Sequence, residues 1–284
     1  MSEDPDVLSV AFRAVSFVLL LNAAGITIFL SGFGHLLPHS LPAIAKLGCR
    51  LAIGALVFVV GHHALEAARM AGDMSGVVDP AMQAMTLRSG EGAAFALRMV
   101  GLALVAVGLR RGATLAIGIT GAVLAAASFA LTGHTSVTAY RPAAAVLLTL
   151  HLLVVAFWLG SLWPLYLVAG REPPPVAARV IDAFSRVAAW VVPVILLAGV
   201  GLILVLVPNW AVFKQPYGQL LLTKVALFAV LMALATLNKW TLGPACARGR
   251  TRAFKQAVAA EYVLICAVLA VTAIMTTFYS PEAP

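Results

Sequence analysis

The sequence predicts an all-α, polytopic membrane protein with about eight transmembrane helices, on the strength of its composition and of the way its apolar residues are grouped. The 284 residues are 62% hydrophobic and only 11% charged, whereas a soluble domain is about half apolar and about a quarter charged. The apolar residues form long runs, each near the roughly 20 residues that a helix needs to cross a bilayer. Strands are not expected, because open strands leave backbone groups unsatisfied in lipid and the runs are too long for barrel strands.

Eight runs have the length and composition of a transmembrane helix. They cover residues 8–30, 43–66, 90–109, 113–132, 143–169, 184–207, 218–240 and 254–278. Their close spacing leaves no room for a separate soluble domain, so we expect residues 1–284 to form a single transmembrane domain. The longest connection, 67–89, includes DPAMQAMTLR. Asp79 as N-cap and Pro80 at the first helical position predict a short helix there.

The distribution of charge predicts how these helices are oriented. Twelve of the nineteen basic residues lie in or beside the connections that follow the odd-numbered runs: Lys46, Arg50, Arg110, Arg111, Arg171, Arg179, Arg186, Lys239, Arg248, Arg250, Arg252 and Lys255. Most acidic residues lie on the other side. By the positive-inside rule the basic side is cytoplasmic, and both termini are expected outside, in the periplasm of a Gram-negative cell. The net charge of +8 then reflects a cytoplasmic rim that contacts anionic membrane lipid, and no nucleic acid is expected as a partner.

Histidines and methionines mark a candidate metal site in the outer half of the bundle. Four of the six histidines map to that half: His62, His63, His134 and His151. Five of the eight methionines fall in one window on the same side: Met70, Met74, Met82, Met85 and Met99. Imidazole and thioether groups are ligands that suit copper, especially Cu(I). The pattern therefore predicts a metal or haem site, with His151 the deepest member, roughly 13 Å below the outer end of its helix.

Three ionisable side chains, Arg98, Lys224 and Glu261, lie inside predicted spans. An ionisable residue at this depth is costly and is functional by default. An internal ion pair, for example between Glu261 and a basic partner, would explain them structurally, and the sequence leaves both interpretations open. Glu66 lies four residues after His62, so these two side chains are expected to pair on one helix face.

The sequence contains no nucleophile elbow, P-loop or dinucleotide fingerprint, and we do not expect an enzyme. The stretch HLLVVAFWLGSLWPL, residues 151–165, resembles the bacterial copper-resistance D (CopD) family of membrane proteins. The stretches 184–202 and 216–240 are similar to later helices of the same family. The most specific matching residues are His151, Trp158, Gly160, Lys224 and Asn238, while Ser161 stands where the family has a second glycine. The resemblance is strongest over residues 130–280.

This resemblance implies a copper-handling protein of the bacterial inner membrane that moves copper ions, as Cu(I) or Cu(II), from the periplasm to the cytoplasm. Copper would come from a separate periplasmic carrier protein. It would bind the outer histidines and methionines and would leave through a cytoplasmic site of His35, His39 and Cys49. Two alternatives stay open: a b-type haem electron-transfer protein, in which histidines of facing helices hold the haem, and a copper-binding membrane partner that does not transport.

Overall fold

The computed structural model describes residues 5–110, 114–133, 140–207 and 209–279. None of these residues forms a strand, and seven of the helices are long and apolar enough to cross a membrane. They are α1 (Pro5–Phe33), α2 (Leu41–Ala71), α4 (Gly90–Gly108), α6 (Arg141–Arg171), α7 (Pro174–Leu206), α8 (Pro216–Leu237) and α10 (Thr251–Phe278). The predicted polytopic helical bundle is confirmed.

The fourth predicted span is the shortest. It corresponds to α5 (Leu115–Ala127), which continues as the 3₁₀ turn η3 (Ser128–Leu131), so that 17 apolar residues are helical in all. The remaining elements are short connections: η1 (Gly34–Leu36), η2 (Met74–Val77), α3 (Pro80–Arg88), η5 (Trp210–Lys214), the π-helical turn η6 (Asn238–Leu242) and α9 (Gly243–Ala247). The predicted cap of α3 is confirmed, because Asp79 Oδ1 accepts a hydrogen bond of 2.8 Å from the Ala81 backbone N–H.

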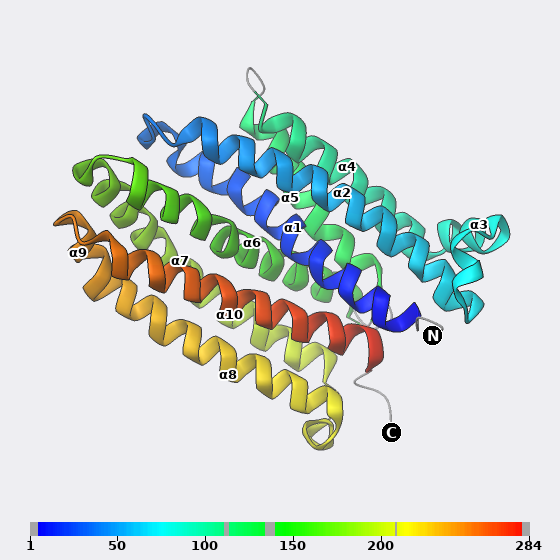
Figure 1. Ribbon diagram of the computed structural model, residues 1–284. Coiled ribbons are helices and arrows are strands. Elements are labelled where there is room, and N and C mark those ends of the chain that lie inside the picture. Colours follow the sequence, from blue (N-terminus) through cyan, green and yellow to red (C-terminus); the bar gives the residue numbers. More distant parts are fainter. Residues whose placement is uncertain (1–4, 111–113, 134–139, 208, 280–284) are drawn as a thin grey trace.

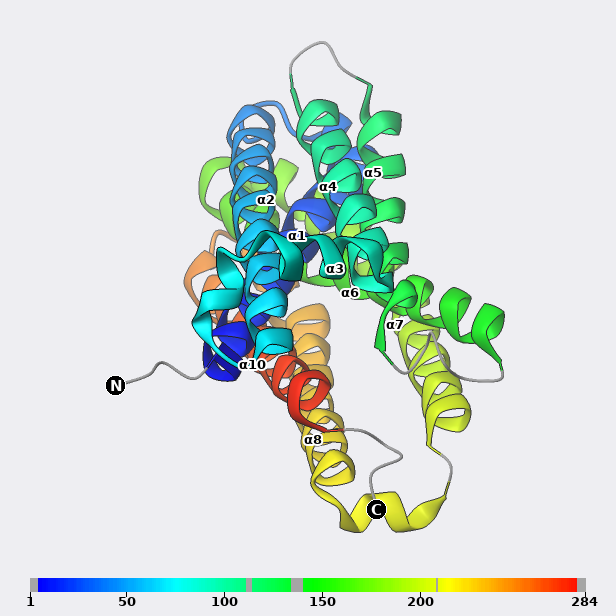
Figure 2. The ribbon, with the colours of Figure 1, turned by 90° about the vertical axis from the view of Figure 1, so that its right-hand side faces the viewer.

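Helix α1 lies at the centre of the bundle, where it packs against α2, α5, α6 and α10 (Figures 1 and 2). The start of α1 and the end of α10 lie at the same end of the bundle, because Arg13 Nη1 donates a hydrogen bond of 3.0 Å to the Thr276 carbonyl. We call this the terminal end. Helix α3 also lies there, whereas η1 and α9 lie at the opposite end (Figure 1).

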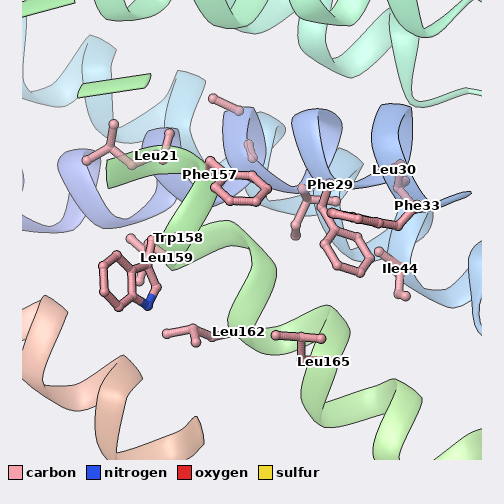
Figure 3. Close-up of a cluster of buried hydrophobic side chains, with 14 of the residues drawn as sticks. Leu21, Phe29, Leu30, Phe33, Ile44, Phe157, Trp158, Leu159, Leu162 and Leu165 are labelled. Atoms are coloured by element: carbon pink, nitrogen blue, oxygen red, sulfur yellow. The ribbon is translucent and has the colours of Figure 1, made fainter. Parts of the chain in front are cut away.

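The core lies where α1 meets α6, and Figure 3 shows its large side chains, including Phe29, Phe157 and Leu162. The two helices cross at Gly25 and Gly160. A Cβ at Gly25 would lie 1.7 Å from the Ala156 carbonyl oxygen, so their backbones are in direct contact. Small residues at such crossings allow membrane helices to pack by close van der Waals contact. This crossing fixes the part of α6 that carries Trp158.

Helices α7 and α8 are much less enclosed than α1. Their most apolar windows are 11% and 6% buried within the chain, against 61% for that of α1. Helix α7 packs on α6 and α9, and α8 packs on α10; Figure 2 shows both at the edge of the bundle. Large apolar side chains such as Trp190 and Leu204 are 81% and 77% exposed. These faces have the composition expected for contact with lipid.

Candidate functional site

His151 lies on the inward side of α6, near α7 and α8. Its Nδ1 atom is buried and has no hydrogen-bond partner in the described part of the chain. On α7, a Cβ at Gly199 would lie 3.8 Å from Cε1 of the ring, and the main chain of Ile195 interacts with the same side chain. On α8, Lys224 is close enough for its charge to act on the imidazole. His151 is therefore held between α6 and α7, and Lys224 of α8 acts on it only through the long-range field of its charge.

A second group of these residues meets around the carboxyl group of Glu261 in α10. Trp158 Nε1 donates a hydrogen bond of 3.2 Å to Glu261 Oε2, and Asn238 Nδ2 donates one to Glu261 Oε1. All three residues are buried, with exposed fractions of 5%, 8% and 4% for Trp158, Asn238 and Glu261. We call these three residues the central carboxyl site. The basic partner considered for Glu261 is not found among the described residues, since both groups that donate to its carboxyl group are neutral N–H groups.

Local structure explains how these residues reach one another. Trp158 follows His151 by seven residues on α6, which places both on the same face about 10.5 Å apart along the helix. Asn238 is the first residue of the π-helical turn η6. A π-helical turn adds one residue to a helix and so changes the direction of the side chains that follow, and such turns are frequent at functional sites. The central carboxyl site thus joins α6, η6 and α10.

A third group of polar side chains lies near the terminal end, between α1 and α2. Arg13 Nη2 lies 3.2 Å from Glu66 Oε1, and Arg69 Nη1 lies 3.0 Å from Glu66 Oε2. Arg69 also pairs with Asp6 at 2.6 Å. The expected pairing of His62 with Glu66 is present, with 3.3 Å between His62 Nε2 and Glu66 Oε1. We call this set the terminal ion cluster.

The two predicted ligands of this region, His62 and His63, have different surroundings. His62 Nε2 accepts a hydrogen bond of 3.0 Å from Arg13 Nε, so this ring nitrogen is already engaged. His63 stacks on Phe95 with 4.2 Å between the ring centres, and its Nε2 is buried without a partner among the described residues. Of the pair, His63 therefore keeps the free ring nitrogen.

A small cavity of ≈ 10 Å³ opens beside these side chains, which is room for about one water molecule. It is lined by Ser16, Val59, His62, His63, Glu66, Glu91, Phe95 and Arg98. Arg98 also donates a hydrogen bond of 3.0 Å from Nε to Ser128 Oγ, and its guanidinium group lies 4.3 Å from the centre of the Phe129 ring. Arg98 lines the cavity and is therefore held in place by residues of η3.

The predicted methionine ligands lie around α3 at the terminal end. Met70, Met74 and Met85 are 51%, 38% and 52% exposed, and Thr86 Oγ1 donates a hydrogen bond of 3.4 Å to Met70 Sδ. Met82 is half-buried, whereas Met99 packs against the core. Thioethers that face the surrounding medium are accessible to a metal ion that approaches this end of the bundle.

At the opposite end, the three residues predicted as an exit site do not converge. His35 is exposed, and Cys49 Sγ lies against the Ala106 carbonyl of α4 at 3.9 Å. His39 Nδ1 lies 3.0 Å from Glu172 Oε2. Glu172 Oε1 also accepts hydrogen bonds from the backbone N–H groups of His39 and Ser40, at 3.1 and 2.7 Å. No local pattern predicts this role for Glu172, which satisfies backbone N–H groups at the N-terminus of α2.

The described residues contain no group of three or more His, Cys, Asp or Glu side chains that could hold a metal ion. His134, the predicted outermost ligand, lies outside the described residues. Arg13 is the main residue of the terminal ion cluster that sequence reasoning missed. Its position inside an apolar run was a signal, but its contacts with His62 and Glu66 join helices that are far apart in the sequence.

Comparisons with known proteins add independent findings. Residues 178–275 match the family model described as copper resistance protein D. Copper resistance protein D of Pseudomonas syringae pv. tomato is 31% identical over 271 residues, which cover 86% of this chain and 84% of that protein. Copper transport protein CutJ of Bacillus subtilis strain 168 is 29% identical over 161 residues, which cover 55% of this chain and 29% of CutJ. No solved structure gives a significant match.

Proposed function

Because this chain belongs to the copper resistance protein D family, we propose that it moves copper ions across the bacterial inner membrane, from the periplasm to the cytoplasm. The observation that carries this proposal is the free, buried Nδ1 of His151 where α6 packs on α7. Imidazole nitrogen is a good copper ligand. An unpartnered ring nitrogen inside a membrane bundle is functional by default.

The rest of the proposed route follows from where the other ligands lie. The terminal end faces the periplasm, and the exposed thioethers of Met70, Met74 and Met85 capture the ion there, together with His134 and the half-buried Met82. The free nitrogen of His63 stands beside the cavity at the same end. His35, His39 and Cys49 remain the candidates for release at the opposite end. A separate periplasmic carrier protein supplies the copper.

Lys224 contributes to the proposed site by limiting how tightly it binds copper. Its ammonium group acts on the His151 ring, and it would repel a metal cation that binds there. Transport requires binding that is favourable enough for the ion to enter and weak enough for it to leave. A cation beside the ligand shortens the time for which copper stays bound, which suits passage more than storage.

The proposal is tested by the copper content of cells that express the chain. His151→Ala is expected to abolish copper-dependent accumulation, measured by elemental analysis of washed cells. Leu150→Ala is the matched control, because it truncates the neighbouring residue of α6, which is 41% exposed, and it should accumulate copper like the wild type. Equal accumulation by the His151→Ala and wild-type chains, at equal membrane levels, would remove His151 from the route.

The same purified protein distinguishes the haem alternative. A protein that handles copper as an ion is expected to have no Soret band in its visible absorption spectrum. A strong Soret band that disappears in His151→Ala would instead assign His151 as a haem ligand.

A further inference from the structure

Glu261 is a carboxyl group held inside the bundle without a compensating charge. It lies within α10, between the ends of this helix at Thr251 and Phe278, and it is 4% exposed. Its carboxyl group is buried and accepts the two hydrogen bonds from Trp158 and Asn238. A buried carboxylate is strongly disfavoured in a low-dielectric interior unless it is paired. Neutral N–H donors alone leave its negative charge uncompensated.

Among the described residues, no charged side chain of the surrounding elements, Lys224 of α8 included, forms an ion pair with Glu261. Helix α10 packs against α1, α6, α8, η6 and α9. Lys255 Nζ of α10 lies 4.2 Å from the centre of the Tyr166 ring of α6, and Lys239 Nζ of η6 lies 5.2 Å from the centre of the Trp240 ring. On α1, Asn22 donates a hydrogen bond of 3.2 Å to the Tyr262 hydroxyl. The other titratable groups nearby are the thiols of Cys246 in α9 and Cys266 in α10.

Asn238 allows this site to satisfy either protonation state of Glu261. Its Nδ2 donates to the Glu261 carboxyl group, while its Oδ1 is buried and has no hydrogen-bond partner in the described part of the chain. When Glu261 carries a proton, rotation of the amide by a half-turn presents Oδ1 to the new O–H group. Trp158 donates to the other carboxyl oxygen in both states, because an indole N–H is only a donor.

The site is also linked to His151 through helix α6. His151 and Trp158 lie about two helical turns apart, and Trp158 contacts Glu261 directly. A copper cation bound at His151 favours the negatively charged form of the Glu261 carboxyl group over its neutral, protonated form, because opposite charges attract each other in a low-dielectric interior. A copper ion at His151 and a proton on Glu261 therefore oppose each other's presence.

We propose that Glu261 is a proton-binding site, which is protonated while the bundle is empty and releases its proton when copper binds at His151. The O–H bond of the carboxyl group breaks, its electron pair stays on the carboxylate oxygen, and water accepts the proton. No oxidation or reduction is involved. The inference rests on the proposed function, since copper binding at His151 supplies the charge that displaces the proton.

The test measures the protons released when copper is added to purified protein in weakly buffered detergent solution with a pH indicator. Neutral imidazole and thioether ligands release no proton when they bind a metal, so protons released by the wild type have another source. Glu261→Gln is expected to lose up to one released proton per bound copper and still to bind copper. Asp182→Asn is the matched acid-to-amide control, because the Asp182 side chain is 65% exposed and pairs with Arg186; it should release protons like the wild type.

Infrared difference spectroscopy between two pH values gives a readout that does not depend on copper. A protonated Glu261 gives a carboxylic-acid carbonyl band that is absent in Glu261→Gln and present in Asp182→Asn. Equal proton release by wild type and Glu261→Gln would overturn the inference while leaving copper binding intact. If the wild type binds no copper, the proposed function fails. The infrared band then decides the proton site alone, since its presence supports protonation of Glu261 and its absence overturns it.

Discussion

Two carboxyl groups in this bundle, the half-buried Glu66 and the buried Glu261, have opposite surroundings. Glu66 contacts Arg13 and Arg69, as well as His62, and it accepts a hydrogen bond of 3.1 Å from Ser9 Oγ. Glu261 accepts hydrogen bonds from the neutral N–H groups of Trp158 and Asn238 and has no ion pair among the described residues. The first carboxylate has its charge compensated and joins α1 to α2. The second has no opposing charge, and so its charge state is free to change.

This difference separates a structural role from a functional one. The terminal ion cluster ties α1 and α2 to the end of α10, since Arg13 also reaches the Thr276 carbonyl. The central carboxyl site includes Trp158 and Asn238, two of the residues that match the family most specifically. It makes fewer polar contacts than the terminal ion cluster. Removing a charge from the first should therefore cost stability, whereas neutralising the second should change function with little change in stability.

The largest effect on stability is expected for Glu66→Ala. The substitution removes the negative charge that compensates the positive charges of Arg13 and Arg69. Breaking a buried ion pair by removing one partner costs about 3 kcal/mol or more. Thermal unfolding of the purified protein in detergent measures the loss. Asp182→Asn serves as the control, because an exposed ion pair contributes about 1 kcal/mol or less. A Glu66→Ala protein as stable as the control would contradict a structural role for the cluster.

An intermediate effect is expected at Glu172, outside the membrane-spanning helices. Burial raises the pKa of this carboxyl group, but hydrogen bonds from Ser40 and His39 outweigh it and hold the pKa below its usual value. Since the folded-state pKa is depressed, the stabilisation is present above the unfolded value of about 4.3 and is lost as the pH falls through the lower, folded value. Glu172→Gln should cost about 1.5 kcal/mol at neutral pH, the contribution of a hydrogen bond to a charged group.

Unfolding measured at a series of acidic pH values tests the Glu172 prediction. The wild type should lose stability as the pH falls below about 4, and the Glu172→Gln protein should lack this part of the decline. An identical acid dependence in the two proteins would show that the carboxylate does not stabilise the start of α2.

The smallest effect on stability is expected for Glu261→Gln, at about 1 kcal/mol or less. The amide keeps one oxygen as an acceptor for Trp158, and Asn238 can turn its Oδ1 toward the new NH₂ group, so no hydrogen bond of the site need be lost. The same unfolding assay measures it. A loss as large as that of Glu66→Ala would mean that the two carboxyl groups do not differ in the way proposed.

The sequence predicted the helices well because their signals are local. The run 143–169 is observed as Arg141–Arg171, and the run 8–30 as Pro5–Phe33, since apolar length determines a span whatever surrounds it. The cap of α3 at Asp79 is likewise a matter of a few neighbouring residues. The pairing of His62 with Glu66 followed from helix periodicity alone.

Contacts between distant helices could not be predicted in this way. Trp158 and Glu261 are 103 residues apart, and Arg13 and His62 are 49 residues apart, so each pairing depends on how whole helices pack. The π-helical turn at Asn238 is hidden from a pattern search that assumes a constant 3.6-residue period. For the same reasons the sequence could suggest either an ion pair or a functional role for Glu261, but could not identify its partners.

Copper uptake into proteoliposomes that contain only this purified chain tests the central claim most directly. Vesicles with the wild type should accumulate copper added outside, vesicles with His151→Ala should take up no more than empty vesicles, and those with Leu150→Ala should match the wild type. Wild-type vesicles that take up no more copper than empty ones, although the protein binds the metal, would contradict transport by this chain and favour a copper-binding partner. Equal uptake by the wild-type and His151→Ala vesicles would contradict a route through His151.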